Sequence, residues 1–195
     1  MPGEIVETQL YKPRKPRKQL KAKRKRIKRG LHRFKRTEAD LKREWLVPTT
    51  AWMRYKGLRG IYWFWLSIEV RKTEWEKYKV CITCLEPLAT WQEGQCGHIL
   101  ASSYCGEFLR LNRMNLTIQH AKCNNPKFSP HAGVANAVNI DKRHGVGYME
   151  RLYSLRKTEC KEPTQDEYRA LIRALPSYQE AVSNSGDNGD NAVAG

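Results

Sequence analysis

Residues 81–127 decide the fold, and they read CITCLEPLATWQEGQCGHILASSYCGEFLRLNRMNLTIQHAKCNNPK. The stretch opens on a C-x2-C pair, Cys81 and Cys84, and 35 residues separate that pair from an H-x2-C pair, His120 and Cys123. Each pair can hold a metal ion from one tight turn, and two pairs complete a tetrahedral Zn²⁺ site. We therefore predict a structural zinc site on these four residues, with folding that depends on the ion. The alternative is a group of buried free thiols beside an unrelated histidine.

The segment between the two pairs predicts short strands. Residues 88–100 resemble a β-hairpin, with a turn signal at Gly94 and a short strand that carries His98. Residues 78–82 are expected to form another short strand, which leads into the first cysteine pair. Together with the helices expected around it, the segment predicts an α+β fold stapled by zinc.

Three polar residues in this segment have a familiar order. His98 on a strand, Asn115 in a loop and Asn124 at the start of a helix resemble the His-Asn-His/Asn order of the HNH nucleases, whose fold is a ββα-metal unit. In such a unit a neutral His98 deprotonates a water and Asn115 supports the loop. A divalent ion, Mg²⁺ or Mn²⁺, offsets the charge that develops on the phosphate, with His98 and Asn124 as its expected ligands.

Across residues 58–180, with a core at 78–130, the chain resembles the phage NinG/Rap family of recombination nucleases. The shared positions are the first cysteine pair, the tryptophan that follows it, Gly97-His98, Leu109-Arg110, Asn115, Gln119, Cys123-Asn124, Gly145 and Glu150-Arg151-Leu152. The resemblance implies a metal-dependent endonuclease that cuts branched DNA, such as Holliday junctions or D-loops. It also implies that Arg110 clamps a phosphate and that Lys127 faces the DNA, since arginine forks onto phosphate oxygens. The alternative for Arg110 is an ordinary surface arginine.

The sequence departs from the HNH pattern beside the proposed base. Gly97 occupies the place where many HNH sites have Asp or His, and Gln95 stands where some relatives have Asp. The first metal ligand is therefore unassigned, with Glu93, Glu107 and Gln95 as candidates. This departure supports an alternative function, a zinc-stapled nucleic-acid-binding protein without cleavage. A third option is a structural zinc module in a larger phage assembly.

Positive charge is concentrated near the N-terminus. The chain has a formal net charge of +16, and residues 12–36 contain 15 Lys or Arg and no acid, which leaves 21 basic and 20 acidic residues elsewhere. Such a segment cannot bury an apolar face, so residues 1–36 are predicted to be a disordered arm. We expect it to bind nucleic acid through phosphate contacts, with Lys23, Arg24, Lys25 and Arg26 at its centre. The alternatives are a solvated tail or a localisation signal.

The rest of the chain predicts helices and one tail. Residues 37–57 read as a short helix and a linker. Residues 58–73 carry both alternating and helical patterns, and we expect a helix whose tryptophans, Trp63 and Trp65, pack in the core. Arg71 and Lys72 on that helix could touch DNA phosphates. Further helices are expected at 134–143, 147–157 and 163–175, the last with a capping box, and residues 181–195 are predicted to be a disordered polar tail.

The composition also bears on location. No stretch reaches the roughly 18 apolar residues of a membrane span, and the N-terminus lacks the pattern of a signal peptide. We therefore expect reduced cysteines and a cytoplasmic protein, in the host cell if a phage encodes it. A homodimer is left open, because an enzyme that cuts two strands would benefit from two-fold symmetry.

Overall fold

The structure is a computed structural model, and it describes residues 37–125, 132–158 and 160–186. Residues 1–36 lie outside the described residues. The predictions for the basic arm, including Lys23, Arg24, Lys25 and Arg26, therefore stay predictions. The same holds for Lys127 and for residues 187–195 of the polar tail.

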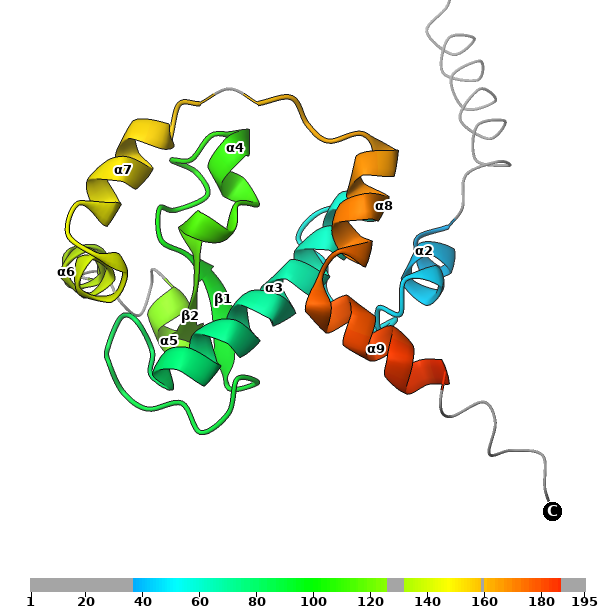
Figure 1. Cartoon of the computed structure of the whole chain (residues 1–195), viewed down its shortest axis with the longest axis horizontal. Helices are drawn as coiled ribbons and strands as arrows, with labels where there is room; N and C mark the ends of the chain where they lie inside the picture. The colour runs from blue at the N-terminus through cyan, green and yellow to red at the C-terminus, as the bar shows by residue number, and fades with distance from the viewer. Residues whose placement is uncertain (1–36, 126–131, 159, 187–195) are drawn as a thin grey trace, which may run out of the picture. The chain divides into compact units, whose positions relative to one another are not determined.

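Helix α3 (Gly57–Tyr78) is the centre of the described fold (Figure 1). Its 22 residues span about 33 Å, and one stripe of the helix is buried, including Ile61, Trp65 and Val70. The helix ends at Lys79, which adopts a left-handed conformation (φ 56°) and bonds its N–H to the carbonyl of Trp75. The helix predicted at 58–73 is confirmed, and it continues one turn further.

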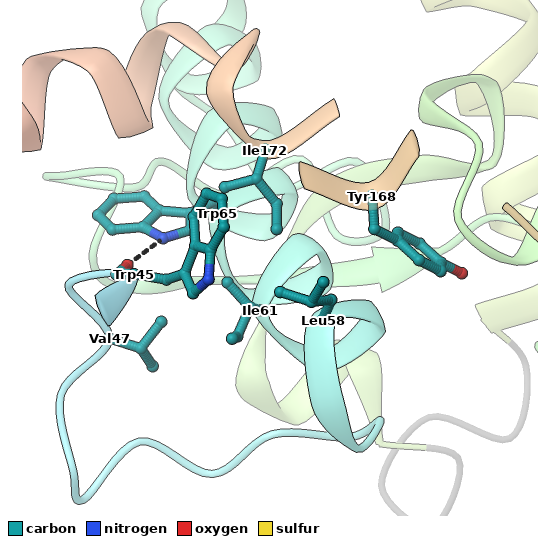
Figure 2. Packing of buried hydrophobic residues seen from close by; sticks show 7 residues of the cluster. All are labelled: Trp45, Val47, Leu58, Ile61, Trp65, Tyr168 and Ile172. Atoms are coloured by element: carbon teal, nitrogen blue, oxygen red, sulfur yellow. Dashed lines mark hydrogen bonds between the residues drawn. The ribbon is translucent and has the colours of Figure 1, made fainter. Parts of the chain in front are cut away.

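One end of α3 packs against three other helices. These are α2 (Glu38–Glu44), α8 (Gln165–Arg173) and α9 (Pro176–Gly186). Figure 2 shows the hydrophobic cluster between them, in which the indole of Trp65 donates a hydrogen bond of 3.0 Å to the carbonyl oxygen of Trp45. Burial of two tryptophans with several aliphatic side chains makes this cluster a major source of stability.

The C-terminal helices confirm one prediction and correct another. The predicted capping box is present at the start of α8, where Thr164 and Glu167 bond each other's backbone N–H groups. A new helix, α9, then begins at Pro176, because proline suits a first helical position. The tail predicted to be disordered from residue 181 therefore starts inside a helix, since α9 reaches Gly186.

The described residues contain one sheet, of two antiparallel strands. Strand β1 (Gly94–His98) pairs with β2 (Leu116–His120), so that Gly94 lies opposite His120 and His98 lies opposite Leu116. Two strands alone are marginal in water, and α3 covers this pair, with Leu66 and Val70 packed on Leu116. The arrangement is α+β, as predicted.

Two predicted strand features are wrong. Residues 78–82 do not form a strand, because α3 runs through Tyr78 and only an isolated bridge joins Val80 to Pro87. Residues 88–100 do not form a hairpin, because β1 pairs with the later strand β2. Gly94 is the first residue of β1 rather than a turn. A side chain there would meet Ile118, with 2.3 Å between the added Cβ and Cγ1.

The remaining helical elements complete the part of the fold around the sheet. They are α4 (Glu107–Arg110), the 3₁₀ turn η1 (Arg113–Asn115), α5 (Ala121–Asn124), α6 (Ala132–His144) and α7 (Tyr148–Leu155). Helices α6 and α7 confirm the helices expected at 134–143 and 147–157, and Ile140 and Leu152 are fully buried in a second hydrophobic cluster. Among the described residues, no helix combines the length and the apolar character that a membrane span requires.

Candidate functional site

The four predicted zinc ligands come together in the structure. The donor atoms of Cys81, Cys84, His120 and Cys123 all lie within 4.8 Å of one another, and Cys84 Sγ is 3.3 Å from His120 Nδ1. A tetrahedral ion with bonds of about 2.3 Å needs donors about 3.8 Å apart, so three thiols and one imidazole here can hold a metal ion. All six cysteines of the chain are free of disulfides.

Local backbone geometry builds this cluster. The first cysteine pair sits in a tight turn, in which the N–H of Leu85 bonds the carbonyl of Cys81, and Leu85 itself is left-handed (φ 61°). The second pair starts at the last residue of β2, where the His120 N–H points at the Cys81 sulfur at 3.3 Å. The amide of Asn139 on α6 donates to the carbonyl of Ile82, which supports the turn from outside.

His98, the predicted base, lies at the other end of the same sheet. Its ring stacks on Trp63 of α3, with centroids 5.4 Å apart and planes 9° apart. His98 Nε2 is 2.9 Å from the carbonyl oxygen of Arg110, and Nδ1 is 3.4 Å from a guanidinium nitrogen of Arg54. Because a carbonyl can only accept, Nε2 carries the proton and Nδ1 is the basic nitrogen of the neutral ring. Burial lowers the pKa of His98 below its ordinary value of 6.5, and the two arginines lower it further.

The Arg54 guanidinium beside the basic nitrogen of His98 belongs to a hydrogen-bond network with Ser102 and Arg110. The guanidinium of Arg54 hydrogen-bonds the Ser102 hydroxyl, and that of Arg110 donates to the Ser102 carbonyl at 3.3 Å. Arg110 also pairs with Glu107 at 2.5 Å. Arg54 is exposed, so a ligand can reach its guanidinium. The site therefore combines a neutral base with two guanidinium groups, a combination suited to binding a phosphate group.

Asn115 is fully buried and holds the loop that follows β1. Its side-chain oxygen accepts from the Leu100 N–H at 2.7 Å, and its amide donates to the Leu100 carbonyl at 3.1 Å. The backbone continues the link, because the Ile99 N–H bonds the Asn115 carbonyl at 2.9 Å. Asn115 thereby fixes the start of the segment that carries Ser102 beside His98.

Asn124 does not meet His98. It is the last residue of α5, not the first, and its amide donates to the Gln95 side chain at 3.1 Å. Side chains alternate along a strand, so His98 points to the face of β1 opposite to that of Gln95 and Gly97. A side chain at position 97 would come within 2.7 Å of the side-chain oxygens of Asn124 and Gln119. The structure thus separates the two residues expected to share a catalytic ion.

The proposed replacement ligands are also engaged elsewhere. Glu93 accepts from the Ala89 N–H at 2.8 Å, Glu107 pairs with Arg59 and Arg110, and Gln95 bonds Asn124. Among the residues that the structure describes, the Cys₃His cluster is the one close group of three or more His, Cys, Asp or Glu donors. Around His98 the polar neighbours are guanidinium groups, a hydroxyl and a carbonyl, which do not fit Mg²⁺ or Mn²⁺.

Arg71 and Lys72 lie further along α3 and make intramolecular contacts. The Arg71 guanidinium donates to the Gly94 carbonyl at 3.2 Å and lies 4.9 Å from the centre of the Trp91 ring. Lys72 pairs with Glu180 of α9 at 2.5 Å. These positions are eight and nine residues beyond Trp63, about 12–14 Å along the helix, so the structure does not bring them to His98.

Two of the three cysteines outside the metal cluster, Cys96 and Cys105, pack in hydrophobic surroundings. Burial raises the pKa of Cys96 to about 12, so its thiol stays neutral, and Cys96 packs beside Leu116. Cys105 is buried among aliphatic side chains, and its sulfur accepts from Asn115 at 3.6 Å. Neither thiol is among the donors of the metal cluster.

Sequence reasoning missed Arg54 as a member of the site. Its loop has no periodic pattern, and the contact with His98 joins residues 44 positions apart. The concentration of aromatic and basic residues at 52–56, WMRYK, is the only signal that could have indicated it. Comparison with known proteins adds no assignment, because no family model, curated protein or solved structure matches the chain.

Proposed function

We propose that this protein is a DNA endonuclease that hydrolyses phosphodiester bonds with His98 as general base. One observation carries the proposal. His98 presents an unprotonated Nδ1 beside the guanidinium of Arg54 while its Nε2 is held by the Arg110 carbonyl at 2.9 Å. This arrangement supplies both a base for water and positive charge for the phosphate.

The ring of His98 is prepared to accept a proton. The Arg110 carbonyl fixes the tautomer, and the stack on Trp63 fixes the ring plane. The lowered pKa keeps the imidazole neutral at pH 7, so Nδ1 can take a proton from an attacking water. In the free protein Arg54 lies near Nδ1, and a bound phosphate would draw the guanidinium toward its own oxygens.

The arginines would stabilise the transition state. Negative charge grows on the phosphate oxygens and on the leaving oxygen during hydrolysis, and donors already in place lower the barrier most. Arg110 is held by Glu107 and by the Ser102 carbonyl, so its guanidinium is oriented before the substrate arrives. Arg54 is exposed and can adjust to the bound strand.

Zinc fits the Cys₃His cluster, and its proposed role is structural. Cys81, Cys84, His120 and Cys123 offer the soft donors and the spacing that structural Zn²⁺ takes. A bound ion would join the turn after α3 to the end of β2 and to α5, all of which lie within one small region. It would supply folding free energy rather than chemistry.

A catalytic Mg²⁺ or Mn²⁺ remains a prediction from the HNH resemblance. The donors around His98 do not fit such an ion, and we derive no step through one. The order β1 with His98, β2, and then α5 with Asn124 supports an HNH-type, ββα-metal interpretation of this unit. Branched DNA as substrate, a homodimer and the host cytoplasm as location rest on the NinG/Rap resemblance and the sequence alone.

The test is a cleavage assay on linear duplex, single strand and four-way junction, each with Mg²⁺, Mn²⁺ or EDTA. The His98→Ala protein is compared with wild type, and His144→Ala serves as the control, because His144 is another partly buried histidine that the mechanism does not use. We expect a loss of about 10²- to 10⁴-fold for His98→Ala alone. Cleavage by His98→Ala at the wild-type rate would contradict the proposal.

The alternative function is nucleic-acid binding without cleavage. Gly97 favours it, because the absence of a carboxylate beside His98 removes the usual anchor of a catalytic ion. Salt-sensitive binding to all three DNAs with no cleavage under any ion would support this alternative. The arginines around His98 would then serve as phosphate contacts alone.

A further inference from the structure

Two aromatic rings beside the His98 site are almost completely exposed. The side chain of Trp52 is 81% exposed and that of Tyr104 is 74% exposed, whereas the next most exposed aromatic of the described residues, Tyr153, is 50% exposed. Tryptophan is mostly buried in folded proteins, since leaving such a large apolar ring in water forgoes a favourable burial. Two such rings near one site indicate a partner that covers them.

Both rings stand on the loops that form the site. Trp52 precedes Arg54 by two residues, and Tyr104 follows Ser102 by two residues. Two residues of extended chain span at most about 7 Å. Arg54 and Ser102 are hydrogen-bonded to each other, and Arg54 also reaches His98. The two residues therefore lie on the loops that carry Arg54 and Ser102, next to the place where the proposed function puts the phosphate.

We propose that Trp52 and Tyr104 are stacking platforms for unpaired bases next to the phosphate bound at Arg54. The inference rests on the proposed function for the identity of the ligand. A nucleotide chain whose phosphate meets Arg54 and Arg110 carries its neighbouring bases toward these two rings. Aromatic side chains stack on any base through its π-face, so this contact requires no particular sequence.

The same contact makes the site selective for DNA structure. In a continuous duplex each base face is covered by the next base pair, and the rings find no free face to stack on. Unpaired nucleotides, as in a single strand, a flap or an opened branch point, offer that face at a much smaller cost in unstacking. The rings therefore favour DNA with unpaired bases beside the scissile phosphate.

The experiment measures binding by fluorescence anisotropy in EDTA, with the full chain and two labelled probes. One probe is a 12-nucleotide single strand, and the other is a blunt duplex of the same sequence. The variants are Trp52→Ala, Tyr104→Ala and the double variant, with Trp52→Phe and Tyr104→Phe as matched controls that keep a ring. Because both side chains are exposed, these changes should leave the fold intact, and a thermal melt checks this.

We expect each alanine variant to weaken binding of the single strand by about tenfold or more, in line with loss of one stacked base. The phenylalanine variants should bind within about threefold of wild type, and duplex binding should change little in all variants. An equal loss on both probes, or no loss on either, would overturn the inference.

The outcome is separable from that of the proposed function. Binding needs no cleavage, so ring-dependent selectivity in a protein that never cuts DNA would support the stacking role and refute the nuclease. Cleavage that requires His98 but is unchanged in the double alanine variant, together with unchanged binding, would refute the stacking role alone.

Discussion

The two ends of the β1–β2 ladder each carry a histidine, and the two have opposite surroundings. His120 closes one end among three cysteines, whose donor atoms lie within 4.8 Å of its own. His98 closes the other end between the Trp63 ring and two guanidinium groups. Four steps along the strands place the two ends about 14 Å apart.

The contrast shows that neighbours, rather than residue type, decide what an imidazole can do. Thiolates around His120 offer a cation four soft donors, so this end can act as a cross-link. Cations around His98 repel a metal ion and a proton alike, which leaves a neutral base that favours an anionic ligand. Since about 14 Å separates the ends, an ion in the cysteine cluster stabilises the sheet without touching the chemistry proposed at His98.

The largest expected effect is on stability, and it follows from disruption of the Cys₃His cluster at the His120 end of the sheet. Cys81→Ser, or removal of metal with a chelator, should abolish the cooperative thermal transition of the domain. Structural zinc contributes about 10 kcal/mol or more, comparable with the whole stability of a domain of this size. Circular dichroism melts would measure this, with Cys160→Ser as control, because Cys160 is exposed and lies outside the cluster. An unchanged melt without metal would contradict the zinc prediction.

At the His98 end of the sheet, Arg54→Ala should lower the rate of cleavage while leaving the fold intact. Removal of one preorganised donor to a developing oxyanion costs about 100-fold in rate. Lys72→Ala is the matched control, because it removes a cation that pairs with Glu180 rather than lying at His98. Equal losses in the two variants would show that overall charge, not the position of Arg54, matters.

Asn115→Ala tests the hydrogen bonds that hold the loop after β1, near the His98 end of the sheet. The change leaves the N–H and the carbonyl of Leu100 without partners in a buried place, which costs about 2 kcal/mol. We expect a lower melting temperature and slower cleavage, with the metal still bound. Metal content from atomic absorption checks the second point, and a variant that lost its zinc would show that the two ends are not independent.

The smallest expected effect is on the pH profile. Protonated His98 cannot act as a base, and its pKa is lowered from 6.5, so the cleavage rate should be flat near neutral pH and fall only at pH values below 6.5. Arg54 contributes to that lowering, so Arg54→Gln should move the acidic limb to slightly higher pH. A limb that stays in place, or moves to lower pH, would mean that His98 is not the titrating base.

The Cys₃His cluster could be predicted well from the sequence because the spacing of its ligands is a local pattern. Both pairs of ligands have x2 spacing within one turn, and the capping box at Thr164 and Glu167 is local in the same sense. The strand that carries His98 was also predicted. Its partner was not, because Gly94 suggests a turn when its real constraint is the close approach of Ile118, a residue on another strand.

The site around His98 could be predicted only in part, since its contacts join segments that are distant in the sequence. Arg54, Trp63 and Arg110 reach His98 from a loop, from α3 and from the end of α4, and no pattern in the sequence links them. Helix α9 was missed for a similar reason. Its composition of Ser, Asn and Gly suggests a loop, but Tyr178 packs against Trp45 and Trp65 and stabilises the helix.

Gly97 limits the order in which mutations can change this protein. A new side chain there would collide with the oxygens of Asn124 and Gln119, each 2.7 Å from the added Cβ, and Gln119 is buried with little room to move. A carboxylate at position 97 would therefore be tolerated only after these two amides had been shortened. The three positions are epistatic, so a directed-evolution experiment should recover Gly97→Asp as a late step and never as a first one.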